Sequence, residues 1–132
     1  MENEGMKAGV RLDTRAAIRR LLAGQKLGVL ATRDPLSPYQ SLVAFAVSKD
    51  LKHIYFATAV NTRKHANLIR FPEVSMLFDD RRNAAADFDR GIAVTVLGRV
   101  AEVKVRSRKE VLGLYVRKHP TLEGFVKSPS CR

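Results

Sequence analysis

Hydrophobic and polar positions follow two different periods along the 132 residues, and the changes of period predict the secondary structure. A period of two, rich in β-branched and aromatic residues, predicts strands at residues 27–32, 39–47, 53–58 and 73–78. A helical period predicts helices at residues 14–24, 62–70 and 107–119. Asp13 or Thr14 is the expected cap of the first helix. Residues 1–12 show little apolar periodicity, so we expect a loose N-terminal arm.

The second half of the chain contains two less regular features. Residues 79–90 are polar and longer than most connections, which favours a functional loop. Residues 91–105 have the pattern of one long strand, but its buried face changes parity just after Gly98, which predicts a bulge or a sharp bend. The spacing of Ser107 and Glu110 is that of a capping box, so we expect the last helix to begin there.

The order of these elements predicts a mainly β protein of the α+β class. Short connections favour antiparallel pairing, and the strands would form a small barrel with helices at its periphery. The length fits a single domain spanning residues 1–132. No apolar run approaches the roughly 20 residues needed to cross a bilayer, and the first residues are acidic where a signal peptide is basic, so we expect a cytoplasmic protein without membrane contact.

Charge and cysteine content limit the possible chemistry. The chain has 24 basic and 13 acidic residues, a net charge of +11, which predicts affinity for anions. Cys131 is the only cysteine, so disulfide frameworks, structural zinc sites and CxxC redox chemistry are excluded. The three histidines do not share metal-ligand spacing. Redox chemistry would therefore require a bound cofactor.

A candidate anion site lies between the third strand and the second helix. Free backbone N–H groups and the positive end of the dipole favour an anion at the start of a helix. Arg63 and Lys64 occupy the first turn, where cations oppose the dipole unless an anion lies between them. Thr58 and Thr62 supply further donors suited to a phosphate monoester. The pattern fits equally well a simple helix cap, formed by Asn61 or Thr62, beside two solvated cations.

These residues and their surroundings resemble a known family. The matching stretches are residues 56–68, 72–75, 94–99 and 117–120, and the chain is similar to the FMN-binding split-barrel proteins related to pyridoxamine 5′-phosphate oxidase. The resemblance implies an antiparallel split β-barrel with peripheral helices. It also implies FMN as cofactor, a homodimer with the flavin in a groove between subunits, and a flavin-dependent oxidoreductase acting on a small molecule.

The resemblance also assigns roles to individual positions. Arg63 and Lys64, assisted by Thr62, would bind the FMN phosphate, while Thr58 and the Ala57 backbone would lie near the phosphate and the ribityl chain. The remaining implied contacts are Ser41, Leu42 and Val43, which would line the isoalloxazine, and Asn83, which would contact the flavin from its loop. Leu42 and Val43 also fit ordinary core positions, and Asn83 fits a solvated turn.

Two departures from the oxidase itself change the expected substrate. The oxidase has a glutamine where this chain has Ile92 and Ala93, and its C-terminal substrate-binding Arg and His region has no counterpart here. We therefore do not expect oxidation of pyridoxamine phosphate. The resemblance also implies a further strand after a segment like residues 128–131, which this sequence does not contain.

Basic residues near the C-terminal end support a second hypothesis. Residues 99–132 carry nine bases and three acids, and a small basic barrel could bind single-stranded nucleic acid without catalysis. Aromatic residues make up only 7% of the chain and tryptophan is absent, which gives weak support to base stacking. Nucleic acid is therefore the less favoured partner.

Overall fold

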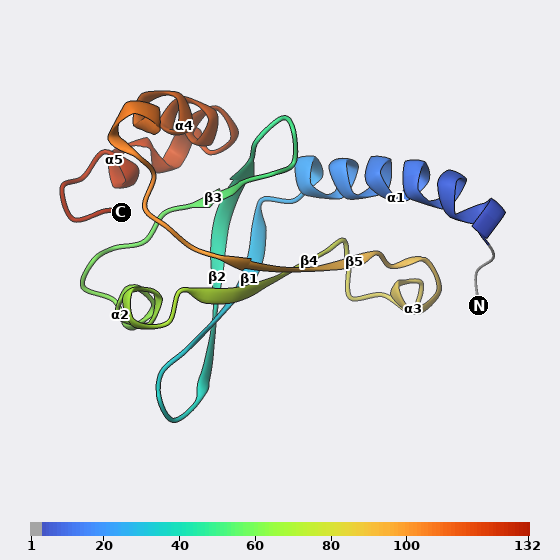
Figure 1. Cartoon of the computed structure of the whole chain (residues 1–132), viewed down its shortest axis with the longest axis horizontal. Helices are drawn as coiled ribbons and strands as arrows, with labels where there is room; N and C mark the ends of the chain where they lie inside the picture. The colour runs from blue at the N-terminus through green and yellow to red at the C-terminus, as the bar shows by residue number, and fades with distance from the viewer. Residues whose placement is uncertain (1–3) are drawn as a thin grey trace.

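The computed structural model of the chain describes residues 4–132, with side chains described from residue 14 onward (Figure 1). Within this part, five strands form one antiparallel sheet in the order β3-β2-β1-β4-β5. The strands are β1 (Leu27–Arg33), β2 (Pro38–Val47), β3 (Ile54–Phe56), β4 (Glu73–Asp79) and β5 (Ala93–Arg99). The helices are α1 (Glu4–Gly24), α2 (Arg63–Arg70), α3 (Asp87–Arg90), α4 (Val105–Lys118), η1 (Pro120–Leu122) and α5 (Glu123–Val126). The curled sheet forms half of a split barrel, which confirms the predicted α+β class.

One face of the sheet carries the main core. Strand side chains alternate between faces, so the register that pairs Leu30 with Met76 places both on this face. The buried members are Leu21, Leu22, Leu30, Val43, Phe45, Leu68, Met76 and Phe78, which come from strands β1, β2 and β4 and helices α1 and α2. The Phe45 and Phe78 rings lie with their centroids 4.5 Å apart at its centre. Both helices are therefore held against the same face of the sheet.

Helix α4 covers one end of the opposite face. Tyr115 is buried there with Ala46 and Val126. Its hydroxyl donates to the Ala44 carbonyl at 3.2 Å, and burial raises its pKa to about 12. The buried His119 ring lies 2.7 Å from the Phe45 carbonyl oxygen, which can only accept, so Nε2 carries the proton. These contacts fix α4 to the backbone of β2.

The remainder of that opposite face carries a group of apolar side chains that are uncovered in the single chain. The strand register places Leu42, Val29 and Leu77 in one row across β2, β1 and β4. Leu42 is 65% exposed and Leu97, on β5, is 80% exposed. A row of exposed leucines on a sheet face is typical of an interaction surface. We call Val29, Leu42, Leu77 and Leu97 the open face.

The N-terminal prediction was wrong about where the first helix begins. Helix α1 begins at Glu4, so residues 4–12 are helical and neither Asp13 nor Thr14 starts the helix. Once a helix is nucleated, extension over good helix formers such as Lys7 and Ala8 is favourable even without apolar periodicity. Residues 1–3 of the predicted arm lie outside the described residues.

The predicted long strand at residues 91–105 was also wrong, because β5 ends at Arg99 without a bulge. The Val100 N–H donates to the Pro72 carbonyl at 2.9 Å, and Pro72 has no N–H to return. Pairing with β4 therefore stops, and the chain leaves the sheet. Helix α4 begins two residues before the expected capping box, since the Ser107 N–H already donates to the Lys104 carbonyl.

The third strand and the polar loop differ in detail from the prediction. Strand β3 ends at Phe56, and Thr58 forms a backbone pair with Arg132 instead. The polar loop contains the short helix α3, and the Asp87 carboxylate accepts from the Arg82 and Ala84 N–H groups. Side-chain hydrogen bonds thus give this loop a defined shape. None of the helices in residues 4–132 combines the length and apolar character needed to span a bilayer.

Candidate functional site

Helix α2 begins at a cluster of hydroxyl and cationic side chains that follows β3. Thr62 caps the helix, since its Oγ1 accepts from the His65 N–H at 3.2 Å. The same hydroxyl donates to the Ala59 carbonyl at 2.8 Å. This confirms the expected cap. It also fixes the Thr62 side chain at the opening of the helix, where unpaired N–H groups face outward.

Thr58 lies against this cap from the end of the third strand. Its side chain is only 4% exposed, and its Oγ1 is 3.2 Å from the Thr62 Oγ1. Its backbone N–H and carbonyl both pair with Arg132, at 2.8 Å each. Two adjacent hydroxyls are therefore held at the helix opening, as the sequence predicted for Thr58 and Thr62.

Lys64 differs from most lysines in its surroundings. It is half-buried, and this burial lowers the pKa of its ammonium group. Among residues 14–132, no carboxylate forms an ion pair with it. A partly desolvated cation without a carboxylate partner can be stabilised by pairing with an anion.

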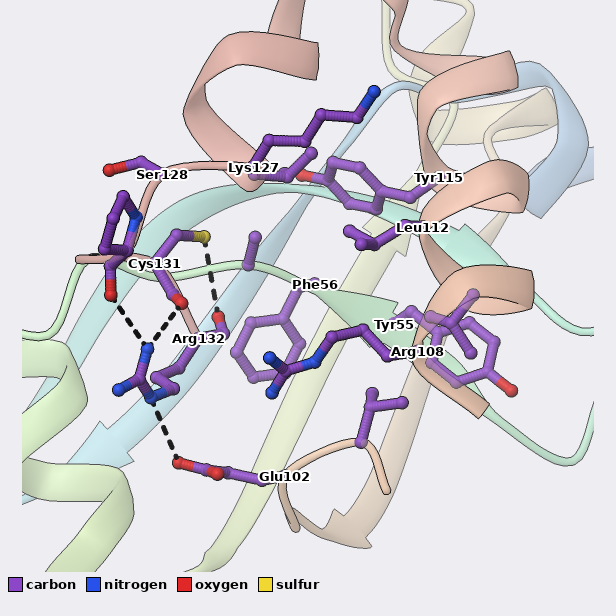
Figure 2. Close-up of a pocket in the computed structure, with 15 residues that line it drawn as sticks. Tyr55, Phe56, Glu102, Arg108, Leu112, Tyr115, Lys127, Ser128, Cys131 and Arg132 are labelled. Atoms are coloured by element: carbon purple, nitrogen blue, oxygen red, sulfur yellow. Dashed lines mark hydrogen bonds and ion pairs between the residues drawn. The ribbon is translucent and has the colours of Figure 1, made fainter. Parts of the chain in front are cut away.

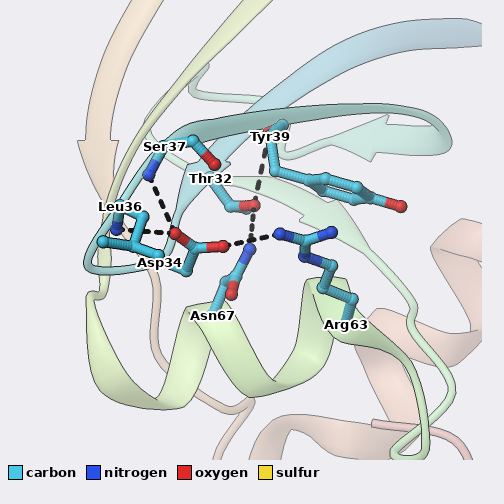
Figure 3. A network of polar contacts seen from close by, with 7 residues as sticks. All are labelled: Thr32, Asp34, Leu36, Ser37, Tyr39, Arg63 and Asn67. Carbon is cyan, nitrogen blue, oxygen red and sulfur yellow. Dashed lines mark hydrogen bonds and ion pairs between the residues drawn. The ribbon is translucent and has the colours of Figure 1, made fainter.

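Arg63 already has an anionic partner within the chain (Figure 3). Its Nη2 donates to the Asp34 Oδ2 at 2.7 Å, and its guanidinium carbon lies 4.9 Å from the centre of the Tyr39 ring. The hydrogen bond from Arg63 is the largest cause that lowers the pKa of Asp34 to about 2, followed by backbone N–H groups of Leu36 and Ser37. The pKa of Arg63 is raised by the same hydrogen bond.

Sequence reasoning missed Asp34, Tyr39 and Asn67 as neighbours of the site. The buried Asn67 side chain donates to the Thr32 Oγ1 at 3.1 Å, which ties α2 to β1 (Figure 3). These partners are 24 to 35 residues apart in the sequence, so local patterns carry no signal for them. Only the strand register, which aligns Thr32 with Tyr39, could have indicated their proximity.

The three β2 positions predicted to line the isoalloxazine do not share a face. Val43 is 4% exposed in the core, and Leu42 points to the open face. Ser41 lies on the core face, and its Oγ is buried without a hydrogen-bond partner. Unpaired buried hydroxyls are uncommon and call for a ligand or water. Of the three, Ser41 and Leu42 therefore remain available to a bound molecule through their side chains.

Ala57 belongs to the wall of a separate cavity of about 330 Å³ (Figure 2). The cavity lies between β3, α4 and the C-terminal segment, and three aromatic rings line it, those of Tyr55, Phe56 and Tyr115. The Arg132 Nε is 3.8 Å from the Glu102 Oε1 at its rim. Ala57 directly precedes Thr58, so one residue of the cavity wall is adjacent in the sequence to the α2 cluster.

Asn83 is not brought to this cluster within one chain. It adopts a left-handed backbone conformation (φ 58°), which asparagine tolerates, in the exposed loop before α3. Helix α2 precedes β4 and this loop follows it, so the two lie at opposite ends of that strand (Figure 1). Among the described residues, no three His, Cys, Asp or Glu side chains form a group that could hold a metal ion.

Three solved structures with this fold are described in different ways. A protein of unknown function, Atu2129 from Agrobacterium tumefaciens, matches with a TM-score of 0.76 and 20% identity, over 89% of this chain and 51% of that one. A heme binding protein from Mycobacterium smegmatis matches with a TM-score of 0.75 and 15% identity, over 86% and 46%. A FAD-binding protein from Mesorhizobium loti matches with a TM-score of 0.61 and 20% identity, over 85% and 76%.

The chain spans about half the length of the first two of these structures. No curated protein sequence matches it. A sequence model of the family described as pyridoxamine 5′-phosphate oxidase matches residues 14–124, which include every strand, α2 and the Thr58 to Lys64 cluster. The chain therefore belongs to the pyridoxamine 5′-phosphate oxidase family.

Proposed function

We propose that this protein binds FMN and acts as a flavin-dependent oxidoreductase on a small molecule. The observation that carries the proposal is the cluster at the start of α2. There Lys64 is half-buried and has no carboxylate partner among residues 14–132, next to the paired hydroxyls of Thr58 and Thr62. Membership of a family whose name specifies an oxidase reaction adds to this support.

The residues present fit the phosphate and the polar chain of FMN. Lys64 would pair with the phosphate dianion and Arg63 would supply a second cation, while the Thr62 hydroxyl would turn its hydrogen from the Ala59 carbonyl to a phosphate oxygen, with Thr58 beside it. The Ala57 backbone, which directly precedes Thr58, would lie near the phosphate and the ribityl chain. Each of these groups donates to or neutralises an anion, which is the donor set that a phosphate monoester requires.

When bound, the flavin supplies hydride or electron transfer at its isoalloxazine. The part of the chain is to bind, orient and shield the ring. The open face, whose member on β2 is Leu42, would exclude water from one side of the ring. No side chain of the cluster has to transfer a proton, so we assign no catalytic acid or base.

We further propose that the protein forms a homodimer with the flavin at the subunit interface. The open face is apolar, and its leucines on β2 and β5 are exposed in the single chain. A second copy would cover this face and complete a groove that half a barrel cannot enclose. Asn83 lies at the far end of β4 from the cluster, so a contact between Asn83 and the same flavin would come from the other copy.

Other ligands are named for proteins of the same fold, and the proposal has to be tested against them. The Mycobacterium smegmatis structure is named as heme binding and the Mesorhizobium loti structure as FAD-binding. A phosphate monoester is the group that the Lys64 cluster fits best. FAD carries its two phosphates in a pyrophosphate bridge without a terminal phosphate, and heme carries carboxylates.

The test is a comparison of ligands on the purified protein. We expect FMN to bind more tightly than riboflavin and FAD, as measured by quenching of flavin fluorescence, and the purified protein to show visible flavin absorption. Equal affinity for FMN and riboflavin would contradict the phosphate site. Uptake of hemin without uptake of any flavin would contradict the proposed cofactor.

A further inference from the structure

We propose that Asp34 is a specificity-determining residue that occupies Arg63 until the phosphate of a flavin replaces it. This inference rests on the proposed function, since it concerns the same phosphate site. Its basis is a difference between two adjacent cations. Lys64 pairs with no carboxylate of residues 14–132, whereas Arg63 is held by Asp34 at 2.7 Å.

The Asp34 carboxylate is fixed by its own turn and does not depend on Arg63 for its position. Its Oδ1 accepts from the Leu36 and Ser37 N–H groups, at 2.8 Å each. Pro35 and Pro38 restrict the backbone of the same turn. Only Oδ2 contacts Arg63. If the ion pair opens, the carboxylate therefore stays in place and the arginine side chain moves.

Arg63 is placed to make such a movement. Its side chain is 57% exposed, whereas that of Asp34 is 20% exposed. Its guanidinium also lies over the Tyr39 ring, which covers one side of the group and leaves the rest of the side chain exposed (Figure 3). Only one guanidinium nitrogen contacts Asp34, so turning toward a second anion breaks a single hydrogen bond.

The ion pair has a clear consequence for ligand choice. An incoming anion competes with a carboxylate that is tethered within reach and therefore has a high effective concentration. Inorganic phosphate also reaches Lys64 and the two threonines but makes no ring contacts, so it displaces Asp34 from Arg63 less readily than FMN does. A flavin phosphate is also held by Lys64, the two threonines and the contacts of the ring, so it displaces Asp34 and binds.

The experiment replaces Asp34→Asn, because asparagine keeps the Oδ1 acceptor of the turn and removes the charge that faces Arg63. We expect FMN to bind about two- to fivefold more tightly, which is the range for an exposed ion pair. The affinity for riboflavin stays unchanged, because riboflavin carries no phosphate. Inorganic phosphate, added as a competitor, weakens FMN binding more in the variant than in the wild type.

The matched control is Asp50→Asn. Asp50 also accepts from a backbone N–H within its turn, that of Lys52, and the pKa of its carboxyl is also lowered, first by a hydrogen bond from Ser48. Within residues 14–132 it has no ion pair with an arginine side chain. We expect this variant to bind FMN, riboflavin and inorganic phosphate as the wild type does.

The outcomes separate the two proposals. If Asp34→Asn has the wild-type melting temperature but binds FMN no more tightly than the wild type, the proposed replacement of Asp34 by the phosphate is overturned, and the flavin site is unaffected. If the wild-type protein binds no FMN, or binds it no better than riboflavin, both the proposed function and the replacement of Asp34 are overturned. Asp34→Ser, which also keeps a side-chain oxygen in the turn, replaces Asp34→Asn if that variant does not fold.

Discussion

Gly28 lies directly against the ring of Phe78: a Cβ built on this glycine would be 2.5 Å from the Phe78 Cε1. The ring is fully buried and packed on Phe45, so it cannot move aside. Close packing of the core thus requires glycine at this position of β1, although its backbone conformation is accessible to any residue.

We predict that Gly28→Ala lowers the free energy of unfolding by about 1–3 kcal/mol, the usual cost of overpacking. Gly98→Ala is the control, because Gly98 also lies in a strand but has no atom within 4 Å of its added Cβ. Urea titration of both variants checks this. Equal stability of the two would show that the Phe78 ring can be displaced.

Replacing Lys64→Ala should weaken FMN binding about ten- to a hundredfold, the value of a hydrogen bond to a charged group. Riboflavin affinity should change little, since only FMN carries the charge that Lys64 would pair. Lys109→Ala, on the exposed surface of α4, removes the same charge elsewhere and should affect neither ligand. A parallel loss for both flavins would contradict the phosphate assignment.

Leu42→Glu should convert the proposed dimer into monomers and release FMN, because a carboxylate cannot be buried unpaired in an apolar interface. Leu36→Glu is the control, since Leu36 is 95% exposed in the turn between β1 and β2, away from the open face. Sedimentation velocity with detection of flavin absorbance measures both effects. A monomeric wild type with stoichiometric FMN would refute the shared site.

Salt should separate the flavin from nucleic acid as a ligand. FMN in a partly buried site should lose little affinity between low and physiological ionic strength. Binding of an oligonucleotide to the basic segment at residues 99–132 would fall by roughly one power of salt for each phosphate contact. Tight oligonucleotide binding by flavin-free protein that takes up no flavin would favour the nucleic-acid hypothesis.

Lys118 gives the protein a predicted pH dependence of stability. Its ammonium nitrogen donates to the Leu22 carbonyl at 2.8 Å and lies 3.8 Å from the centre of the Phe45 ring, and burial lowers its pKa to about 8. The unfolded chain therefore binds more protons than the folded one between about pH 8 and 10.5, so the Lys118 contribution to stability rises with pH in this range.

The variant Lys118→Met should lack this rise. We expect the stability of the wild type relative to Lys118→Met to increase from about pH 7 to about pH 9.5, before tyrosine ionisation interferes. Thermal melts in matched buffers measure the difference. Lys109→Met should follow the pH dependence of the wild type, and a constant difference between wild type and Lys118→Met would contradict the prediction.

The strands and the cap of α2 could be predicted because their signals are local. Alternation around Leu30 and Val43 marks buried strand positions, and Thr62 precedes a helical period. The end of β5 could not be predicted this way, because Val100 continues an apolar pattern and only the missing N–H of Pro72 stops the pairing. Strand length here depends on the partner strand and not on the strand itself.

The chemistry of the site was predictable only in part. The sequence indicated Arg63 and Lys64 as equivalent cations, because they are neighbours of the same charge. Their difference comes from Asp34, which is 29 residues before Arg63 and reaches it through a turn between two strands. A single sequence contains no local signal for such a contact. The buried pair of Asn67 and Thr32, which are 35 residues apart, was missed for the same reason.

Helix α2 joins an edge strand of the half-barrel, β3, to β4 on the far side of β1, and Asn67 fastens its middle to Thr32. The helix thus connects the two sides of the curved sheet. A ligand that contacts both Thr58 and Lys64 would fix the connecting segment between β3 and α2 at both of its ends. Ligand binding would then make local opening of the whole sheet less frequent. Backbone amide hydrogens of β1 and β2, far from any ligand atom, would therefore exchange with solvent more slowly.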